Sequence, residues 1–332
     1  LIVSLLLSDY FETAGHAMSW GLFISGILQF VFLWVCSKRA GIHIKIQRPK
    51  FNADVKKILY VMGPAVIGAG VVHINLFADI IIASFLGEGS ISYLYYADRL
   101  NQLPLGVVGI AVGTALLPML SRAMVQEDKS EATHLFNRSL EYCMLLALPA
   151  AVALSVMPLS LITVLFERGA FTSSDSAITA NILSAYAIGL PAYIAIKVFS
   201  TAHWSRQDTK TPVRISIIGT VLNIALSIIA IQYIGVVGIA LATGLTGWLQ
   251  IYMHIRALKD HPSAHFDTKL KTNMPKIIGA SCVMGGAVYI LAALLHEYIF
   301  SDAEVIKMAA LGAVIIVGAI VYTVSIFAFG AV

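Results

Sequence analysis

Residues 62–123 read MGPAVIGAGVVHINLFADIIIASFLGEGSISYLYYADRLNQLPLGVVGIAVGTALLPMLSRA, and they contain most of two apolar segments. These segments, at about 57–86 and 90–121, are each long enough as helices to cross the roughly 30 Å hydrocarbon core of a bilayer. The whole chain is 58% hydrophobic and only 12% charged, whereas soluble domains are roughly 25% charged. We therefore expect an all-α polytopic membrane protein. A secreted disulfide scaffold, a nucleic-acid-binding module and a soluble Rossmann or barrel enzyme are excluded.

Nine segments are apolar over enough residues to span a membrane. Only helices satisfy the backbone internally at that length, since the short alternating strands of a barrel are absent from the sequence. The chain starts inside a further apolar run, residues 1–7, and ends at Val332 without a polar tail. We expect a piece of a longer protein, with one truncated span before nine full transmembrane helices. The nine expected spans are about 14–37, 57–86, 90–121, 135–165, 177–203, 212–233, 235–257, 275–297 and 303–330.

The charges of the connecting loops alternate. One set of loops carries 18 of the 22 Lys and Arg residues, whereas the opposite loops hold only Arg168 and Lys307 beside eight carboxylates. The positive-inside rule makes the basic set cytoplasmic and places the C-terminal end inside. We interpret the basic loops as a topology signal rather than as a nucleic-acid or anionic-lipid site. They are 37–57, 122–138, 204–214 and 256–276.

Four Asp, Lys or Arg side chains fall well inside the expected spans: Asp79, Asp98, Arg99 and Lys197. A charge at the bilayer centre costs about 2.5–3.5 kcal/mol even on insertion scales, so each needs a physical reason. Lys197 could reach the cytoplasmic surface with its flexible stem or have a structural role. An arginine in a wet cavity suits phosphate, because its planar fork donates two hydrogen bonds and keeps its charge. An interhelical ion pair is the alternative for Asp98 and Arg99.

Three further polar residues lie at one depth. Counted from the ends of their spans, Asp79, Asn223 and Thr243 each sit roughly 10–15 Å below the outer surface. A carboxylate, an amide oxygen and a hydroxyl are ligands that small hard cations accept. Hydrogen bonds between helices explain the same residues equally well.

The sequence contains no motif of a catalytic site. HExxH, GxSxG, P-loop and dinucleotide fingerprints are absent, so no motif in the sequence argues for an enzyme. The three cysteines, Cys36, Cys143 and Cys282, are far apart in apolar surroundings and are interpreted as space-filling thiols.

The segment 62–123 closely resembles the MviN/MurJ family of lipid II flippases. LFERGAF (165–171), ALPAAVAL (147–154) and SRQDTKTPV (205–213) resemble the same family at the expected spacings. The resemblance implies a two-lobed fold of the multidrug/oligosaccharidyl-lipid/polysaccharide exporter type, with the nine spans as the family's sixth to fourteenth helices. It also implies three parts: 1–56 as the end of the N-terminal lobe, 57–257 as a six-helix C-terminal lobe, and 258–332 as two added helices that form a lipid-tail groove.

The resemblance also implies roles for individual residues. Arg99 matches the family's cavity arginine that engages the pyrophosphate of lipid II, and Asp98 is its neighbour. Asp79, Asn223 and Thr243 match a sodium site that some members have, but Ser227 stands where a second carboxylate occurs. No organic cofactor is implied.

The expected function is translocation of lipid II from the inner to the outer leaflet of the bacterial cytoplasmic membrane by alternating access. Lipid II is the undecaprenyl-pyrophosphate-linked disaccharide-pentapeptide used in peptidoglycan synthesis. The closest alternative is an O-antigen, polysaccharide-lipid or multidrug exporter of the same superfamily. A membrane enzyme acting on polyprenyl phosphates would need paired acidic metal ligands near the cytoplasmic face, and Glu127, Asp128 and Asp260 do not form such a cluster. A non-transporting scaffold would tolerate apolar residues in place of its intramembrane charges.

Overall fold

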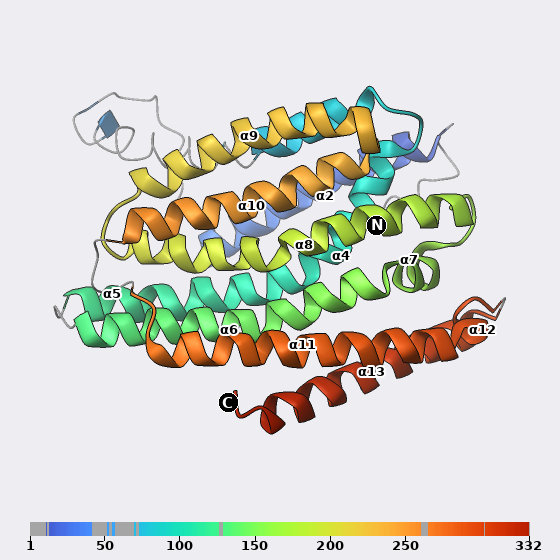
Figure 1. Cartoon of the computed structure of the whole chain (residues 1–332). Coiled ribbons are helices and arrows are strands. Elements are labelled where there is room, and N and C mark those ends of the chain that lie inside the picture. Colours follow the sequence, from blue (N-terminus) through green and yellow to red (C-terminus); the bar gives the residue numbers. More distant parts are fainter. Residues whose placement is uncertain are drawn as a thin grey trace. The chain divides into compact units, whose positions relative to one another are not determined.

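The computed structural model describes residues 11, 13–41, 52, 55–56, 70, 73–125, 129–259, 265–301 and 303–331. Within these ranges all regular elements are helices (Figure 1). Contacts between residues divide the chain into two units, Leu1–Leu59 and Tyr60–Val332. Each unit is described by itself.

The first unit contains one long helix, α2 (Ala14–Arg39). Its N-terminus is capped by Thr13, whose side chain accepts a hydrogen bond from His16 N, and its last turn carries Lys38 and Arg39. Twenty-six residues make a helix of roughly 39 Å. Large apolar side chains are exposed around it, including Leu22 and Phe30. A helix that is apolar all round is typical of a membrane span.

The second unit is built around α8 (Ser173–Trp204), which packs mainly against four other helices. These are α4 (Ser90–Ala111), α6 (Lys129–Val156), α7 (Pro158–Phe166) and α10 (Val237–Leu258). A capping box between Thr172 and Asp175 fixes its first turn. The backbones of α8 and α10 approach closely, since a Cβ added to Gly189 would lie 2.5 Å from the Cα of Gly244. Glycine is therefore required at this crossing, because any side chain would force the two helices apart. The next helix along, α9 (Lys210–Ile234), packs on α10.

Two expected spans have interruptions in the structure. The span expected at 90–121 consists of α4 (Ser90–Ala111), a π-helical turn (Val112–Leu116) and α5 (Leu117–Val125). The span expected at 135–165 is wrong as a single helix, because α6 (Lys129–Val156) ends before Met157 and α7 (Pro158–Phe166) starts anew. Proline at the first position of a helix lacks an N–H that would be unpaired there anyway, which makes it a favourable start.

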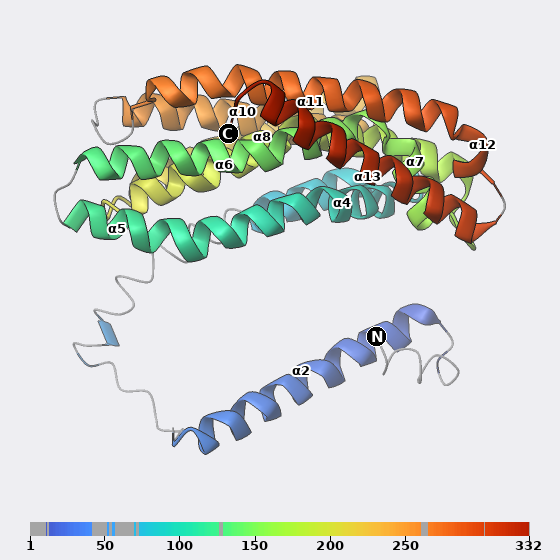
Figure 2. The ribbon, with the colours of Figure 1, turned by 90° about the horizontal axis from the view of Figure 1, so that it is seen from below.

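The last three helices form an antiparallel hairpin on the surface of α6 (Figure 2). It consists of α11 (Thr268–Leu294), the short α12 (His296–Ile299) and α13 (Glu304–Ala328). A small separate apolar core, made of Ile277, Ala280, Ile326 and Ala331, joins its two long helices. The Tyr322 hydroxyl donates a 2.6 Å hydrogen bond to the Leu145 carbonyl of α6.

Seven of the described helices are long and apolar enough to cross a membrane. The protein is therefore a multi-pass membrane protein, but the expected number of nine full spans is not confirmed. Residues 57–69 and 71–72 of the second expected span lie outside the described residues, and the rest of it forms a short apolar helix, His73–Ser84. The expected loop 122–138 is also mostly helical, because α5 continues to Val125 and α6 begins at Lys129. The seven are 15–39, 90–123, 130–156, 173–204, 210–234, 268–294 and 304–328.

Candidate functional site

The polar residues expected at one depth do meet in the folded chain. Asp79 lies on the helix His73–Ser84, Asn223 on α9 and Thr243 on α10. Asp79 is 9% exposed and Asn223 is 2% exposed. Asn223 Nδ2 lies 3.1 Å from Thr243 Oγ1, and its amide oxygen lies 3.3 Å from Asp79 Oδ1. Three helices are thus joined through one buried polar cluster.

A fourth member of this cluster, Asn75, was not among the residues expected from the sequence. Asn75 Nδ2 donates a 3.4 Å hydrogen bond to Asp79 Oδ2, and Asn75 Oδ1 lies 3.0 Å from the Asn223 amide. The signal was available, since residues four apart share one face of a helix. An uncharged amide in an apolar span does not by itself indicate a site, because membrane helices often use such residues for hydrogen bonds to one another.

The Asn223 amide has two possible orientations, which must be assigned from its neighbours. With the nitrogen toward Asp79, it donates to Asp79 and Asn75, while the oxygen accepts from Thr243 Oγ1 and N at 3.1 Å each. With the oxygen toward Asp79, three oxygen atoms converge without a hydrogen between them. The first orientation satisfies the cluster by hydrogen bonds alone and is the better assignment for the chain without a bound ion. In the second orientation a cation or a proton on Asp79 would have to lie between the oxygens.

Ser227 lies one turn beyond Asn223 on α9. It is fully buried, and its hydroxyl has no hydrogen-bond partner among the described residues. A buried hydroxyl without a partner costs free energy and calls for an explanation.

Arg99 and Asp98 lie in the first half of α4 and do not pair with each other. Arg99 is exposed, and its guanidinium carbon lies 4.5 Å from the centre of the Tyr95 ring. Asp98 is half-buried and accepts a hydrogen bond from Gln102. No ion pair of the described residues includes Arg99. Among the described residues, therefore, no carboxylate occupies the Arg99 guanidinium, and it is available to a ligand.

The ammonium group of Lys197, on α8, lies beside Gly109 of α4. A Cβ placed on Gly109 would lie 2.3 Å from Lys197 Nζ. Gly109 therefore provides the space into which the ammonium group fits.

A buried ionic network that was not expected joins α6 to α11. Arg138 pairs with Glu141 on its own helix and with both carboxylate oxygens of Asp267, at 3.0 and 2.7 Å. Asn273 donates to Glu141, and Asn137 Oδ1 accepts from Asp267 N at 3.1 Å. Burial raises the pKa of Asp267, but hydrogen bonds from Leu270 N and Arg138 lower it more, so the pKa lies below its usual value.

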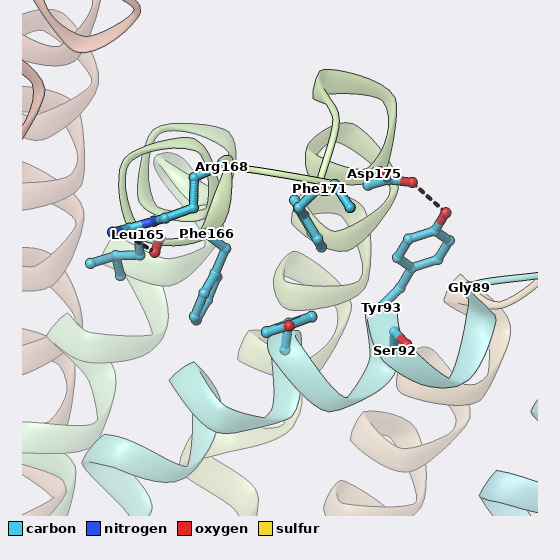
Figure 3. A pocket seen from close by; sticks show the side chains of 10 residues that line it. Gly89, Ser92, Tyr93, Leu165, Phe166, Arg168, Phe171 and Asp175 are labelled. Carbon is cyan, nitrogen blue, oxygen red and sulfur yellow. Dashed lines mark hydrogen bonds between the residues drawn. The ribbon is translucent and has the colours of Figure 1, made fainter. Parts of the chain in front are cut away.

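A cavity of about 570 Å³ lies where the N-termini of α4 and α8 approach the α7–α8 loop (Figure 3). Tyr93 donates a 2.5 Å hydrogen bond to Asp175 Oδ1 across it. Its other lining residues are Gly89, Ser92, Tyr96, Leu165, Phe166, Arg168, Ala170 and Phe171.

The fold defines the class of protein as a helical, multi-pass membrane protein. The described fold matches a MOP superfamily transporter from Pyrococcus furiosus with a TM-score of 0.50 at 21% identity, over 79% of this chain and 62% of that one. That likeness concerns the fold alone.

The family is given by closer matches. Residues 1–310 match the family described as "Lipid II flippase MurJ". The "Probable lipid II flippase MurJ" of Rhizobium tropici is 36% identical over 100% of this chain and 63% of its own length. The structure "Lipid II flippase MurJ, inward closed conformation" matches with a TM-score of 0.78 at 29% identity, over 98% of this chain and 63% of that one. The chain belongs to the MurJ family, and it spans 51–63% of the length of three curated relatives.

Proposed function

We propose that the intact protein is a flippase that moves lipid II from the inner to the outer leaflet of the bacterial cytoplasmic membrane by alternating access. The observation that carries this proposal is the family match over residues 1–310. The relatives bear the name of lipid II flippases. The proposal concerns the intact protein, because the chain spans less than two thirds of their length.

Arg99 would bind the pyrophosphate of the substrate. A charged headgroup cannot cross hydrocarbon without compensation, so the path needs a fixed positive charge. The Arg99 guanidinium is exposed, and its planar fork fits two phosphate oxygens at once. Asp98, which Gln102 holds in place, would accept hydrogen bonds from polar groups of the same headgroup.

The lipid tail would lie along the α11–α13 hairpin, which would correspond to the two added helices of the family. Apolar side chains of α13 point away from the protein core, among them Ile316, Ile320 and Val324, which are 57–62% exposed. An apolar face of this kind can accept a polyprenyl chain while the headgroup crosses inside the lobe.

The topology proposed for this chain is nine full spans with a cytoplasmic C-terminal end. It is supported by the charge pattern of the loops, in which 18 of the 22 Lys and Arg lie on one side. Arg99 then lies nearer to the outer end of its span than to the inner one.

A sodium ion would fit the cluster formed by Asp79, Asn75, Asn223 and Thr243. In one orientation of the Asn223 amide, its oxygen lies 3.0 Å from Asn75 Oδ1 and 3.3 Å from Asp79 Oδ1. The unpartnered Ser227 hydroxyl one turn away offers a further oxygen. One carboxylate balances one positive charge, which favours a monovalent ion. The ion would neutralise Asp79 and tie the helix His73–Ser84 to α9 and α10.

The sodium proposal is tested by thermal unfolding of the intact protein in sodium chloride and in choline chloride at equal ionic strength. A ligand at 100 times its dissociation constant stabilises the folded state by about 2.7 kcal/mol. We expect sodium to raise the melting temperature of the wild type and of the control Asp208→Asn, but not that of Asp79→Asn. Equal melting temperatures of the wild type in both salts would leave the hydrogen-bonded arrangement as the explanation of the cluster.

The function itself is tested in proteoliposomes that contain the intact protein and fluorescent lipid II. We expect lipid II to reach the opposite leaflet faster than in protein-free vesicles. A drug or an undecaprenyl-linked O-antigen unit transported in its place would favour the exporter alternatives, which share the fold.

A further inference from the structure

The cavity between α4, α8 and the α7–α8 loop is separate from the Asp79 cluster, yet it continues the face of α4 that carries Arg99. Ser92, Tyr96 and Arg99 are spaced by four and three residues, which places them in one row along the helix. Two of them, Ser92 and Tyr96, line the cavity. Ser92, the more distant of the two, lies seven residues before Arg99, which is about 10 Å along the helix axis. The cavity therefore begins within this distance of Arg99.

The floor of the cavity is aromatic. The Tyr96 ring lies 4.9 Å from that of Phe166 in a tilted arrangement and 5.2 Å from that of Phe171, edge to face. Aromatic rings offer a large, rigid contact surface at a small cost in conformational entropy. The cavity, of about 570 Å³, is open to the surface, so a ligand in it would stay partly exposed.

The rim carries one group of each charge, the carboxylate of Asp175 and the guanidinium of Arg168. The Asp175 carboxylate is already used, because it accepts from the Tyr93 hydroxyl and from both the N–H and the hydroxyl of Thr172. Arg168 is exposed, and its side chain donates one hydrogen bond in the described part of the chain, to Leu165 O at 2.7 Å. An arginine has five N–H donors, so most of its binding capacity remains.

The Arg168 side chain is folded back toward Leu165 in Figure 3. Exposed side chains change rotamer within picoseconds to nanoseconds, and one surface hydrogen bond is all that the change would break. A carboxylate at the rim would gain a bidentate, charge-assisted pair in exchange. Arg168 and Lys307 are the two Lys or Arg residues of the loops that lie opposite the basic set. An anion on that side would therefore have few competing sites.

We propose that this cavity is a second binding site for the saccharide–peptide headgroup of the transported lipid, next to the Arg99 site. A sugar ring would lie on the rings of Tyr96 and Phe171, and a carboxylate of the peptide would bind Arg168. The identity of the ligand rests on the proposed function. The site would hold the headgroup after it leaves Arg99 and before it is released.

The test uses the intact protein in nanodiscs and the soluble disaccharide-pentapeptide, which has neither lipid nor pyrophosphate. Titration calorimetry would measure its binding to the wild type, to Arg168→Gln, to Tyr96→Leu and to the matched control Lys307→Gln. We expect saturable binding that Arg168→Gln weakens roughly tenfold or more and that Lys307→Gln leaves unchanged. A probe amidated at its carboxylates should bind the wild type as weakly as the unmodified probe binds Arg168→Gln.

Absence of saturable binding to the wild type would overturn the proposal, and so would equal binding by the wild type and Arg168→Gln. Arg168 is at the surface, so this variant tests the site even if Tyr96→Leu does not fold. The binding assay needs no transport. Lipid II transport without probe binding would refute this site alone, whereas probe binding without lipid II transport would refute the proposed function alone.

Discussion

The buried ionic network between α6 and α11 gives a quantitative prediction about stability. Glu141 is 5% exposed and accepts from Arg138 and Asn273. Replacing it by leucine leaves the 8% exposed Arg138 with only Asp267 and leaves the Asn273 amide without its carboxylate. Removing one partner of a buried ion pair lowers the free energy of unfolding by about 3–5 kcal/mol. Because Arg138 keeps Asp267, we expect about 3 kcal/mol for Glu141→Leu.

The assay is reversible unfolding of the purified intact protein in mixed micelles, with the free energy of unfolding determined for each variant. The double variant Arg138→Met/Glu141→Leu removes both charges of the pair, so it should cost at least about 1 kcal/mol less than the sum of the two single variants. Glu304→Leu, at an exposed position in the first turn of α13, is the control. A cost below about 0.5 kcal/mol for Glu141→Leu, the range of ordinary surface changes, would refute this reasoning.

Two further predictions concern stability. The pKa of Asp267 is lowered in the folded state. Its stabilising contribution is therefore complete above the unfolded-state pKa of about 3.9 and is lost as the pH falls through the lower folded-state pKa. The melting temperature should drop on acidification toward pH 3, and it should drop less steeply in Asp267→Asn. An equal drop in both proteins would contradict this assignment. Gly189→Ala should destabilise by about 1–3 kcal/mol, because the new Cβ would lie 2.5 Å from Gly244 Cα, whereas Gly286→Ala, where a Cβ meets nothing within 4 Å, should not. Equal melting temperatures of these two variants would show that the α8–α10 crossing is loose.

The helical membrane fold follows from the sequence because its physical signal is local. Apolar runs of sufficient length indicate membrane spans directly. Seven described helices are long and apolar enough to cross a membrane, and five of the nine expected spans each correspond to one uninterrupted helix among these seven. The break at Met157 could have been read from Pro158, but an apolar run hides the difference between one helix and two. The π-helical turn at Val112–Leu116 has no such local signal.

The polar cluster could be found in part because depth can be counted along helices. The number of residues from the end of each span places Asp79, Asn223 and Thr243 at one depth in the membrane. The hydrogen bonds of the structure add Asn75 to them. The role of the cluster stays a prediction. The cavity could not be foreseen, since Tyr96 and Phe171 come from segments 75 residues apart in the sequence and their contact depends on how α4 packs against α8.

The ionic network shows a different limit. The charge pattern assigns Arg138 to a basic loop, although it is 8% exposed within α6. Its partner Asp267 is 129 residues away, so no spacing rule connects them. Charge alternation predicts the side of the membrane on which a loop lies, but it does not tell which charges are buried.

The proposed function is tested most directly by measuring the lipid II that reaches the outer leaflet in cells whose own flippase can be switched off. The intact wild type would be compared with Arg99→Ala and with the matched control Arg256→Ala, which removes an arginine from the last turn of α10. We expect the wild type and Arg256→Ala to restore outer-leaflet lipid II, and Arg99→Ala to fail at equal membrane abundance. Full restoration by Arg99→Ala, or none by a well-expressed wild type, would contradict the assignment.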